Sequence, residues 1–344
     1  MNLQLPLEEK HYIIKDNAEY AKILYYLNHE NNLSDSKKHK SFTMEHISKN
    51  INSSIYNPNP INHTIKYLSD ELASYQDKIY IQTIKYKLSK EYFYYYDINK
   101  HNEENMLYSD ELKKTHIICY DINSQEFELL LTTEDEIANG IQQSTGNIII
   151  KDKDKITIYN EDFEQLYQIK DLVDGVGYCR KICSARTGNM YFSGVLRIYK
   201  YNEKGIFCNR IGNLEINNYY GYDLMTTYEK KLILGQCNNA SYNSMYIYDH
   251  SSGEYDFSLN EVNELHIRAI TTMHYNNGFL YIFSPNLGKN SSLIQILDMR
   301  KNNSVFKTIN IEQTKPTYIH SIHNIDNKIY IADTANNELY YVEI

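Results

Sequence analysis

The sequence predicts an all-β protein, a six-bladed β-propeller with a short N-terminal helical extension, and three observations carry this prediction. The chain has 344 residues, enough for one large β domain with a small appendage. Hydrophobic residues make up 42% of it and charged residues 23%, so it can bury a core. Six segments also share one outline: a polar residue, a short strand, a tight turn and an apolar strand.

The six repeated segments define the blades. Their first residues are Asp70, Asn139, Lys181, Asp223, Thr271 and His320. Aligning one apolar position in each gives Tyr80, Ile149, Tyr191, Ile233, Tyr281 and Tyr330, with successive spacings of 69, 42, 42, 48 and 49. Each segment continues into a third apolar strand and usually a fourth. Four short antiparallel strands every 40 to 50 residues indicate propeller blades.

The first spacing is about 20 residues longer than the others. Two strand-like runs, FYYYDINK from Phe93 and HIICYDINSQEFELLL from His116, fall within it. We expect an inserted hairpin between the second and third strands of that blade. The alternative is a degenerate seventh blade.

The last repeat resembles a known family. The segment IYIADTANNELYYV from Ile329 is similar to the NHL-type propeller repeat, in which an apolar strand, Ala-Asp and a small-residue turn with Asn precede another apolar strand. The resemblance covers one blade, and the other five share only spacing and strand pattern. It implies a six-bladed fold and leaves the function open, because propellers host many functions.

The N-terminal part differs in composition, and we divide the chain into an extension, 1–40, and a propeller, 41–344. Asp16 and Glu19 form a capping box, and apolar residues recur at helical spacing after it, so 17–29 should form one amphipathic helix that packs on the propeller or binds a partner. The last blade lacks a fourth strand in the sequence. We expect 41–58 to supply it and close the ring.

Net charge and cysteine content limit the expected partners and the expected cellular compartment. The net charge of −9 argues against nucleic-acid and anionic-membrane partners. Five cysteines without paired spacing and the lack of an export signal predict a cytoplasmic protein with reduced thiols. Tyrosine is abundant, with 35 residues, and tryptophan is absent. Tyrosine is enriched at binding hot spots, so a tyrosine-rich face is one candidate recognition surface.

The channel mouth is the other candidate. Residues that begin the innermost strands gather around one mouth of a propeller. The predicted ligand-binding residues are therefore Asp70, Asn139, Lys181, Asp223, Thr271 and His320. If Asp70, Asp223 and Lys181 converge on His320, the carboxylates should favour a protonated imidazole and make binding sensitive to pH between about 6 and 8.

Two functions follow. The first is a non-enzymatic module that binds a protein, peptide or small polar ligand, with no cofactor, because no catalytic motif occurs and no catalytic residues are assigned. The second is a cation-dependent hydrolase. Glu71, Asn139 and Asp223 offer oxygen ligands for calcium or another divalent cation, which is similar to the gluconolactonase and paraoxonase group, although Lys181 opposes such a site. His274 and His323 occupy equivalent positions and are interpreted as structural.

Overall fold

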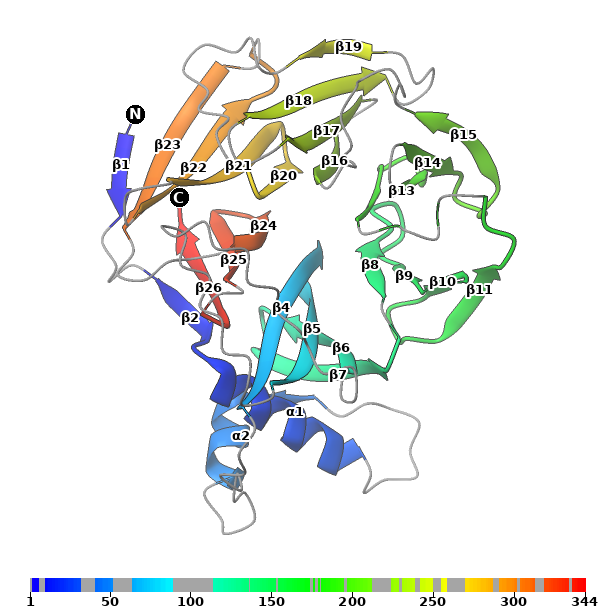
Figure 1. Cartoon of the computed structure of the whole chain (residues 1–344). Helices are drawn as coiled ribbons and strands as arrows, with labels where there is room; N and C mark the ends of the chain where they lie inside the picture. Colours follow the sequence, from blue (N-terminus) through cyan, green and yellow to red (C-terminus); the bar gives the residue numbers. More distant parts are fainter. Residues whose placement is uncertain are drawn as a thin grey trace.

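A computed structural model provides the structure of the chain (Figure 1). The described residues are 2–5, 10–31, 41–51, 64–88, 114–135, 137–152, 154–173, 176, 179, 181–194, 197–211, 224–228, 231–238, 242–249, 255–258, 270–286, 291–301, 304–312, 319–333 and 336–344. Within them the strands form six sheets arranged around a central axis. The all-β propeller class and the short N-terminal helix are confirmed.

Each sheet has its first strand at the axis and later strands farther out. The innermost strands are β4 (Thr64–Tyr75), β8 (Ala138–Ile141), β12 (Ile182–Ser184), β16 (Leu224–Tyr228), β20 (Thr272–Asn276) and β24 (Ile319–Ile325). The second strands are β5 (Lys78–Leu88), β9 (Ile148–Lys151), β13 (Met190–Ser193), β17 (Lys231–Asn238), β21 (Phe279–Asn286) and β25 (Lys328–Asp333). All six repeated segments therefore form the predicted hairpins.

The third and fourth strands complete the sheets. The third strands are β6 (Lys114–Asp121), β10 (Ile156–Tyr159), β14 (Ile198–Tyr201), β18 (Tyr242–Asp249), β22 (Ser291–Asp298) and β26 (Glu338–Glu343). The fourth strands of the first five sheets are β7 (Glu126–Thr133), β11 (Gln165–Ile169), β15 (Phe207–Ile211), β19 (Tyr255–Ser258) and β23 (Ser304–Glu312). In the first sheet β6 pairs directly with β5. The predicted inserted hairpin falls on 89–113, outside the described residues.

Apolar side chains fill the spaces between neighbouring sheets. All four side chains of β9 are buried, as are those of β13, because a sheet in a propeller is covered on both faces. The turns between first and second strands contain residues with positive φ, including Gly146 at 78° and Gly188 at 85°. Glycine suits these positions because it has no Cβ to clash in the left-handed region.

The prediction that 41–58 closes the ring is wrong. The fourth strand of the last sheet is β2 (His11–Ile14), which pairs antiparallel with β26. Its neighbour Lys10 lies 3.7 Å from Glu338 and over the ring of Tyr340. The described part of 41–58 forms β3 (Phe42–Thr43) and α2 (Met44–Ile51) instead, and β3 extends the first sheet at β7.

Local sequence explains why this segment becomes helical. The hydroxyl of Thr43 accepts a hydrogen bond from the backbone N–H of His46 at 3.2 Å, so Thr43 caps α2. Met44 and Ile47, three residues apart, then face the same cluster of apolar side chains, and Ile47 is fully buried. An N-terminal segment still closes the last sheet, but it comes from farther upstream.

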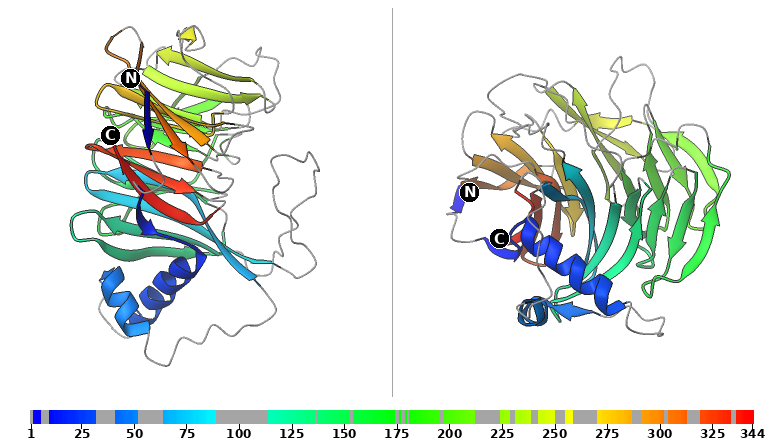
Figure 2. Two further views of the ribbon diagram at one scale, coloured as in Figure 1. Left: turned by 90° about the vertical axis from the view of Figure 1, so that its left-hand side faces the viewer. Right: turned by 60° about the horizontal axis from the view of Figure 1, so that its bottom comes forward.

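The predicted helix is confirmed as α1 (Asn17–Asn31). Asp16 accepts hydrogen bonds from the backbone N–H groups of Ala18 and Glu19, and Glu19 accepts one from Lys15. The apolar face of α1 packs with α2 against the first and last sheets (Figure 2), with four core side chains at most 4% exposed: Tyr20, Ile23, Leu24 and Leu27. The packing interpretation of this helix therefore holds.

The extreme N-terminus adds a further strand. β1 (Asn2–Leu5) pairs in parallel with β23, the outer strand of the fifth sheet. Together β1, β2 and β3 place one strand each on the fifth, sixth and first sheets, as the side view in Figure 2 shows for β1 and β2. The N-terminal segment thus crosses the junction where the ring of sheets begins and ends. No helix among the described residues is long and apolar enough to cross a membrane.

Candidate functional site

A cavity of about 640 Å³ lies on the axis, enclosed by all six innermost strands and the turns that follow them. Its lining is mainly uncharged and polar, with hydroxyl, carboxamide and imidazole groups. Charged side chains also border it: Lys181, Arg186, Arg300, Asp77 and Asp326. Arg300 pairs with Asp298 at 3.0 Å, Asp77 accepts a hydrogen bond from Asn123, and Arg186 reaches Asn277 at 3.5 Å, while Lys181 also interacts with other groups of the chain.

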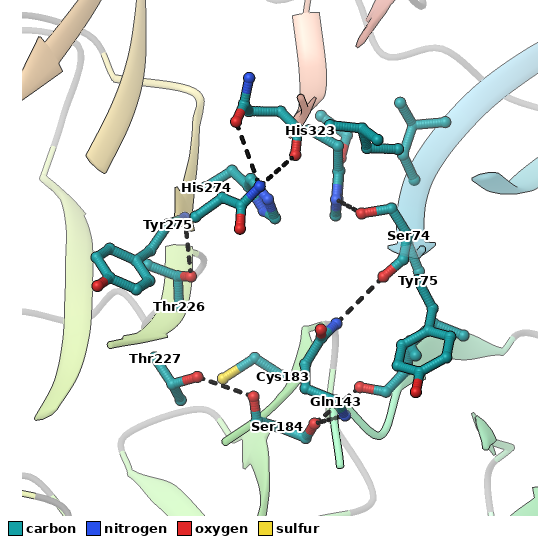
Figure 3. A pocket seen from close by; sticks show the side chains of 18 of the residues that line it. Ser74, Tyr75, Gln143, Cys183, Ser184, Thr226, Thr227, His274, Tyr275 and His323 are labelled. Carbon is teal, nitrogen blue, oxygen red and sulfur yellow. Dashed lines mark hydrogen bonds between the residues drawn. The ribbon is translucent and has the colours of Figure 1, made fainter. Parts of the chain in front are cut away.

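Hydrogen bonds join every neighbouring pair of innermost strands or of the turns beside them (Figure 3). We call this ring of contacts the channel belt. In chain order, its members are Gln143 Nε2 to Ser74 O, Gln143 N to Ser184 Oγ, Thr227 Oγ1 to Ser184 O, Tyr275 N to Thr226 Oγ1, Asn276 Nδ2 to Asn324 O, and Ser74 Oγ with His323 Nδ1. The channel belt satisfies polar groups and fixes the spacing of the sheets around the cavity.

Two histidines stand side by side in the lining. The ring centroids of His274 on β20 and His323 on β24 are 4.3 Å apart, with a 40° angle between the rings. Loss of hydration in the channel lowers the pKa of His274 to about 4, against a smaller opposing effect of a hydrogen bond to the backbone of Asn324. Loss of hydration also holds the pKa of His323 well below its usual value, helped by His274 and Lys181. Both imidazoles are therefore neutral at pH 7.

Both neutral imidazoles contact residues of a neighbouring innermost strand. His323 interacts with Ser74 at 2.7 Å and with the backbone of Leu72, and His274 interacts with the backbone of Asn324. The Nδ1 atom of His323 is therefore engaged by the neighbouring strand β4. The structural interpretation of these histidines agrees with their contacts.

The predicted mouth residues have different outcomes. Asn139 and Lys181 both border the cavity. Thr271 does not line it, although the next residue, Thr272, does. Asp70 lies in β4 beside a register shift, and His320 lies in β24, but the structure does not describe their side chains. Asp223 lies outside the described residues. The convergence of the six side chains and the protonation of His320 stay predictions.

Of the three predicted cation ligands, one has a side chain that the structure describes. Asn139 borders the cavity, whereas the side chain of Glu71 and the residue Asp223 lie outside the described set. Among the described residues no group of three or more His, Cys, Asp or Glu side chains is placed to hold a metal ion. Lys181, a fixed positive charge, borders the same cavity. The structure does not describe the other two predicted ligand side chains, so the divalent-cation site stays a prediction.

Sequence reasoning missed most of the channel belt. Several of its side chains, with the two histidines, stand six or seven residues before the aligned apolar position of their repeats: Ser74, Gln143, Ser184, Thr226, Thr227, His274, Tyr275, His323 and Asn324. When the repeats are aligned, these two equivalent positions are occupied mostly by polar residues, which is the signal that could have revealed them. They are not the position predicted from Asp70 and its equivalents, because residues farther along the innermost strands line the channel.

One comparison with a solved structure supports the fold. No protein-family model matches the chain, and no curated protein matches it significantly in sequence. A gluconolactonase of Xanthomonas campestris superposes with a TM-score of 0.51 at 10% identity, over 82% of this chain and 89% of that one. A virginiamycin B lyase of Staphylococcus aureus gives 0.48 at 13% identity, over 82% and 100%. The Pan2 WD40 domain of Neurospora crassa gives 0.45 at 8% identity, over 84% and 92%. The likeness to the gluconolactonase is one of propeller fold alone.

Proposed function

We propose that this propeller is a non-enzymatic binding module that takes a small polar ligand into the axial cavity. The observation that supports the proposal is the cavity of about 640 Å³ whose lining is polar and mainly uncharged. Ligand sites are usually preformed concave spaces with a few convergent polar groups. Hydrogen bonds of the channel belt hold this space in shape before any ligand arrives.

The proposal counts each of the six sheets as one blade. The aligned repeat positions are equivalent around the axis only with this count. A cytoplasmic location and the lack of nucleic-acid and membrane partners remain predictions from the sequence. The tyrosine-rich face is less favoured than the cavity because large tyrosines such as Tyr80, Tyr191 and Tyr330 are buried between sheets.

The test is a fragment screen by NMR on the full chain, using a library with neutral, anionic and cationic members. Fragments that enter the cavity should shift the imidazole signals of His274 and His323. The signal of His46, on α2 outside the cavity, is the matched internal control. We expect several hits that shift the first two signals and leave the third in place. A screen in which no fragment shifts either channel histidine contradicts the proposal.

An enzymatic result would also contradict it. Lactone and ester substrates should show no turnover above the uncatalysed rate, with calcium present or with a chelator. Turnover that depends on the cation and is lost in Asp223→Ala would instead establish the hydrolase function.

A further inference from the structure

Asn139 differs from the other polar residues around the cavity. It lies on β8, is 1% exposed, and neither its side-chain oxygen nor its nitrogen has a hydrogen-bond partner. Among the described residues that border the cavity, no other has a buried side-chain atom without a partner. Burying an unpaired polar group costs free energy, so a buried, unpaired carboxamide beside a cavity requires an explanation.

The position of Asn139 is fixed by the surrounding backbone. Residues 138–141 pair along β9, with Asn139 opposite Ile150. The next residue, Gly140, lies against the innermost strand of the third sheet, where an added Cβ would come within 2.7 Å of Ile182. Asn139 is therefore carried by a strand that packs closely on the next sheet rather than by a loop. A rigid strand is suited to recognition because little conformational entropy is lost on binding.

A carboxamide presents one donor and one acceptor side by side in one plane. Its best complement is a group with the reverse arrangement in the same spacing, as in a carboxamide or lactam edge, which gives two parallel hydrogen bonds. Asparagine uses this geometry when it binds the planar edge of adenine. A carboxylate offers two acceptors and an amidinium two donors, so each leaves one atom of Asn139 unpaired.

The surrounding charges favour an uncharged ligand. His274 and His323 are neutral at pH 7, and the hydroxyls of Ser74 and Ser184 are used within the channel belt. Lys181 borders the cavity but interacts with other groups of the chain. Among the described residues that border the cavity, Asn139 therefore carries the buried polar group that the fold leaves unpaired.

We propose that Asn139 is the recognition residue of the cavity and that it binds the planar amide group, carboxamide or lactam, of a small uncharged ligand. This inference rests on the proposed binding function and specifies the ligand class. A free small molecule and the side-chain carboxamide of a peptide share this chemistry.

The test uses three probes of one shape that differ only in the head group: benzamide, benzoate and benzamidine. Affinities are measured by NMR titration of the full chain, followed at His274 and His323. We expect wild type to prefer benzamide over each charged analogue by at least about fivefold, the low end for one well-formed pair of parallel hydrogen bonds. A preference for benzoate or benzamidine, or no preference, overturns the inference.

Two variants sharpen the test. Asn139→Asp replaces the donor by a second acceptor and should move the preference from benzamide to benzamidine. Asn139→Leu has similar volume and no polar atoms, so it should lose the preference for benzamide while melting at or above the wild-type temperature, because no hydrogen bond is lost. Asn209→Leu, on the outer strand β15, is the matched control and should bind like wild type. An Asn139→Asp variant that keeps the wild-type order of affinities contradicts the assignment.

The fragment screen separates this inference from the proposed function. If fragments shift the channel histidines but benzamide, benzoate and benzamidine bind equally, the amide specificity is wrong and the binding function stands. If no fragment enters the cavity, both are wrong. A peptide with glutamine side chains, compared with one carrying glutamate, then distinguishes a peptide source of the amide from a free small molecule.

Discussion

Ser74 and His323 lie 249 positions apart in the chain, yet the Oγ of Ser74 is 2.7 Å from Nδ1 of His323. This contact joins the innermost strand of the first sheet to that of the last. It is one of six junctions in the channel belt, and it is the one between the first and the last sheets in chain order. The ring of sheets is therefore closed at the axis by side chains as well as at the rim by the N-terminal strand β2.

Ser74→Ala should destabilise the protein. The substitution removes the hydroxyl and leaves the Nδ1 atom of His323 without that partner, which costs about 1–3 kcal/mol for a buried group. Urea denaturation measures the change in the free energy of unfolding. Ser124→Ala, in the exposed turn between β6 and β7, is the control and should have no measurable effect. Equal stabilities of the two variants would show that the ring does not depend on this hydrogen bond.

Stability should fall as the pH is lowered through the histidine range. The folded-state pKa of His274 is about 4, below the usual 6.5, and that of His323 is also lowered. Between about pH 4 and 6.5 the unfolded chain therefore binds more protons than the folded one. The contribution of these groups is complete above pH 6.5 and is lost toward pH 4. Denaturation at pH 7 and pH 5 measures it, and His274→Gln should reduce the difference. An unchanged difference in that variant contradicts the lowered pKa.

Removal of residues 1–15 should open the last sheet. This deletion takes away β1 and β2, and the outer edge of β26 then loses its backbone partners. Because an open strand edge pairs readily with other chains, we expect a lower melting temperature and association on size-exclusion chromatography. Removal of residues 1–6 retains β2 and should have a smaller effect. If the longer deletion melts like the full chain and stays monomeric, β2 is not needed for closure.

Leu27→Ala should show how strongly α1 is docked. Leu27 is fully buried in the cluster that joins α1 to the first and last sheets. Truncating a buried leucine costs about 2–5 kcal/mol, from lost burial and the cavity left behind. Leu166→Ala, at a leucine on β11 that is 49% exposed, is the matched control and should change stability little. A small effect at Leu27 would mean that the helix is not part of the cooperative unit.

The fold class could be read from the sequence because each repeat carries its own local signals. Alternating strands, tight turns with residues such as Gly146, and the capping box at Asp16 are all short-range patterns. The strand β2 has no comparable signal. It is four residues long, and its partner strand begins more than 320 positions later, so only the assembled ring reveals the pairing.

The site was harder to predict, because aligned repeats show which residues are equivalent but not how deeply each side chain is buried. Asn139 was found by its polar character at the start of a strand, and it borders the cavity. That its carboxamide is buried and unpaired follows from the positions of neighbouring side chains, which no single-sequence pattern contains. The segment 41–58 was expected to be a strand because the last blade lacked a fourth one, whereas the cap at Thr43 and the burial of Ile47 favour the helix α2.

The pairing of β2 with β26 also sets an order of events during synthesis. Residues 11–14 leave the ribosome long before their partner strand, Glu338–Glu343. At synthesis rates of about 5–20 residues per second, roughly 15 to 70 seconds separate the two. Throughout that interval the nascent chain carries an edge strand whose partner does not yet exist. A ribosome that stalls before β26 is made therefore holds an unclosed ring, and β2 can be covered only after that strand has been synthesised.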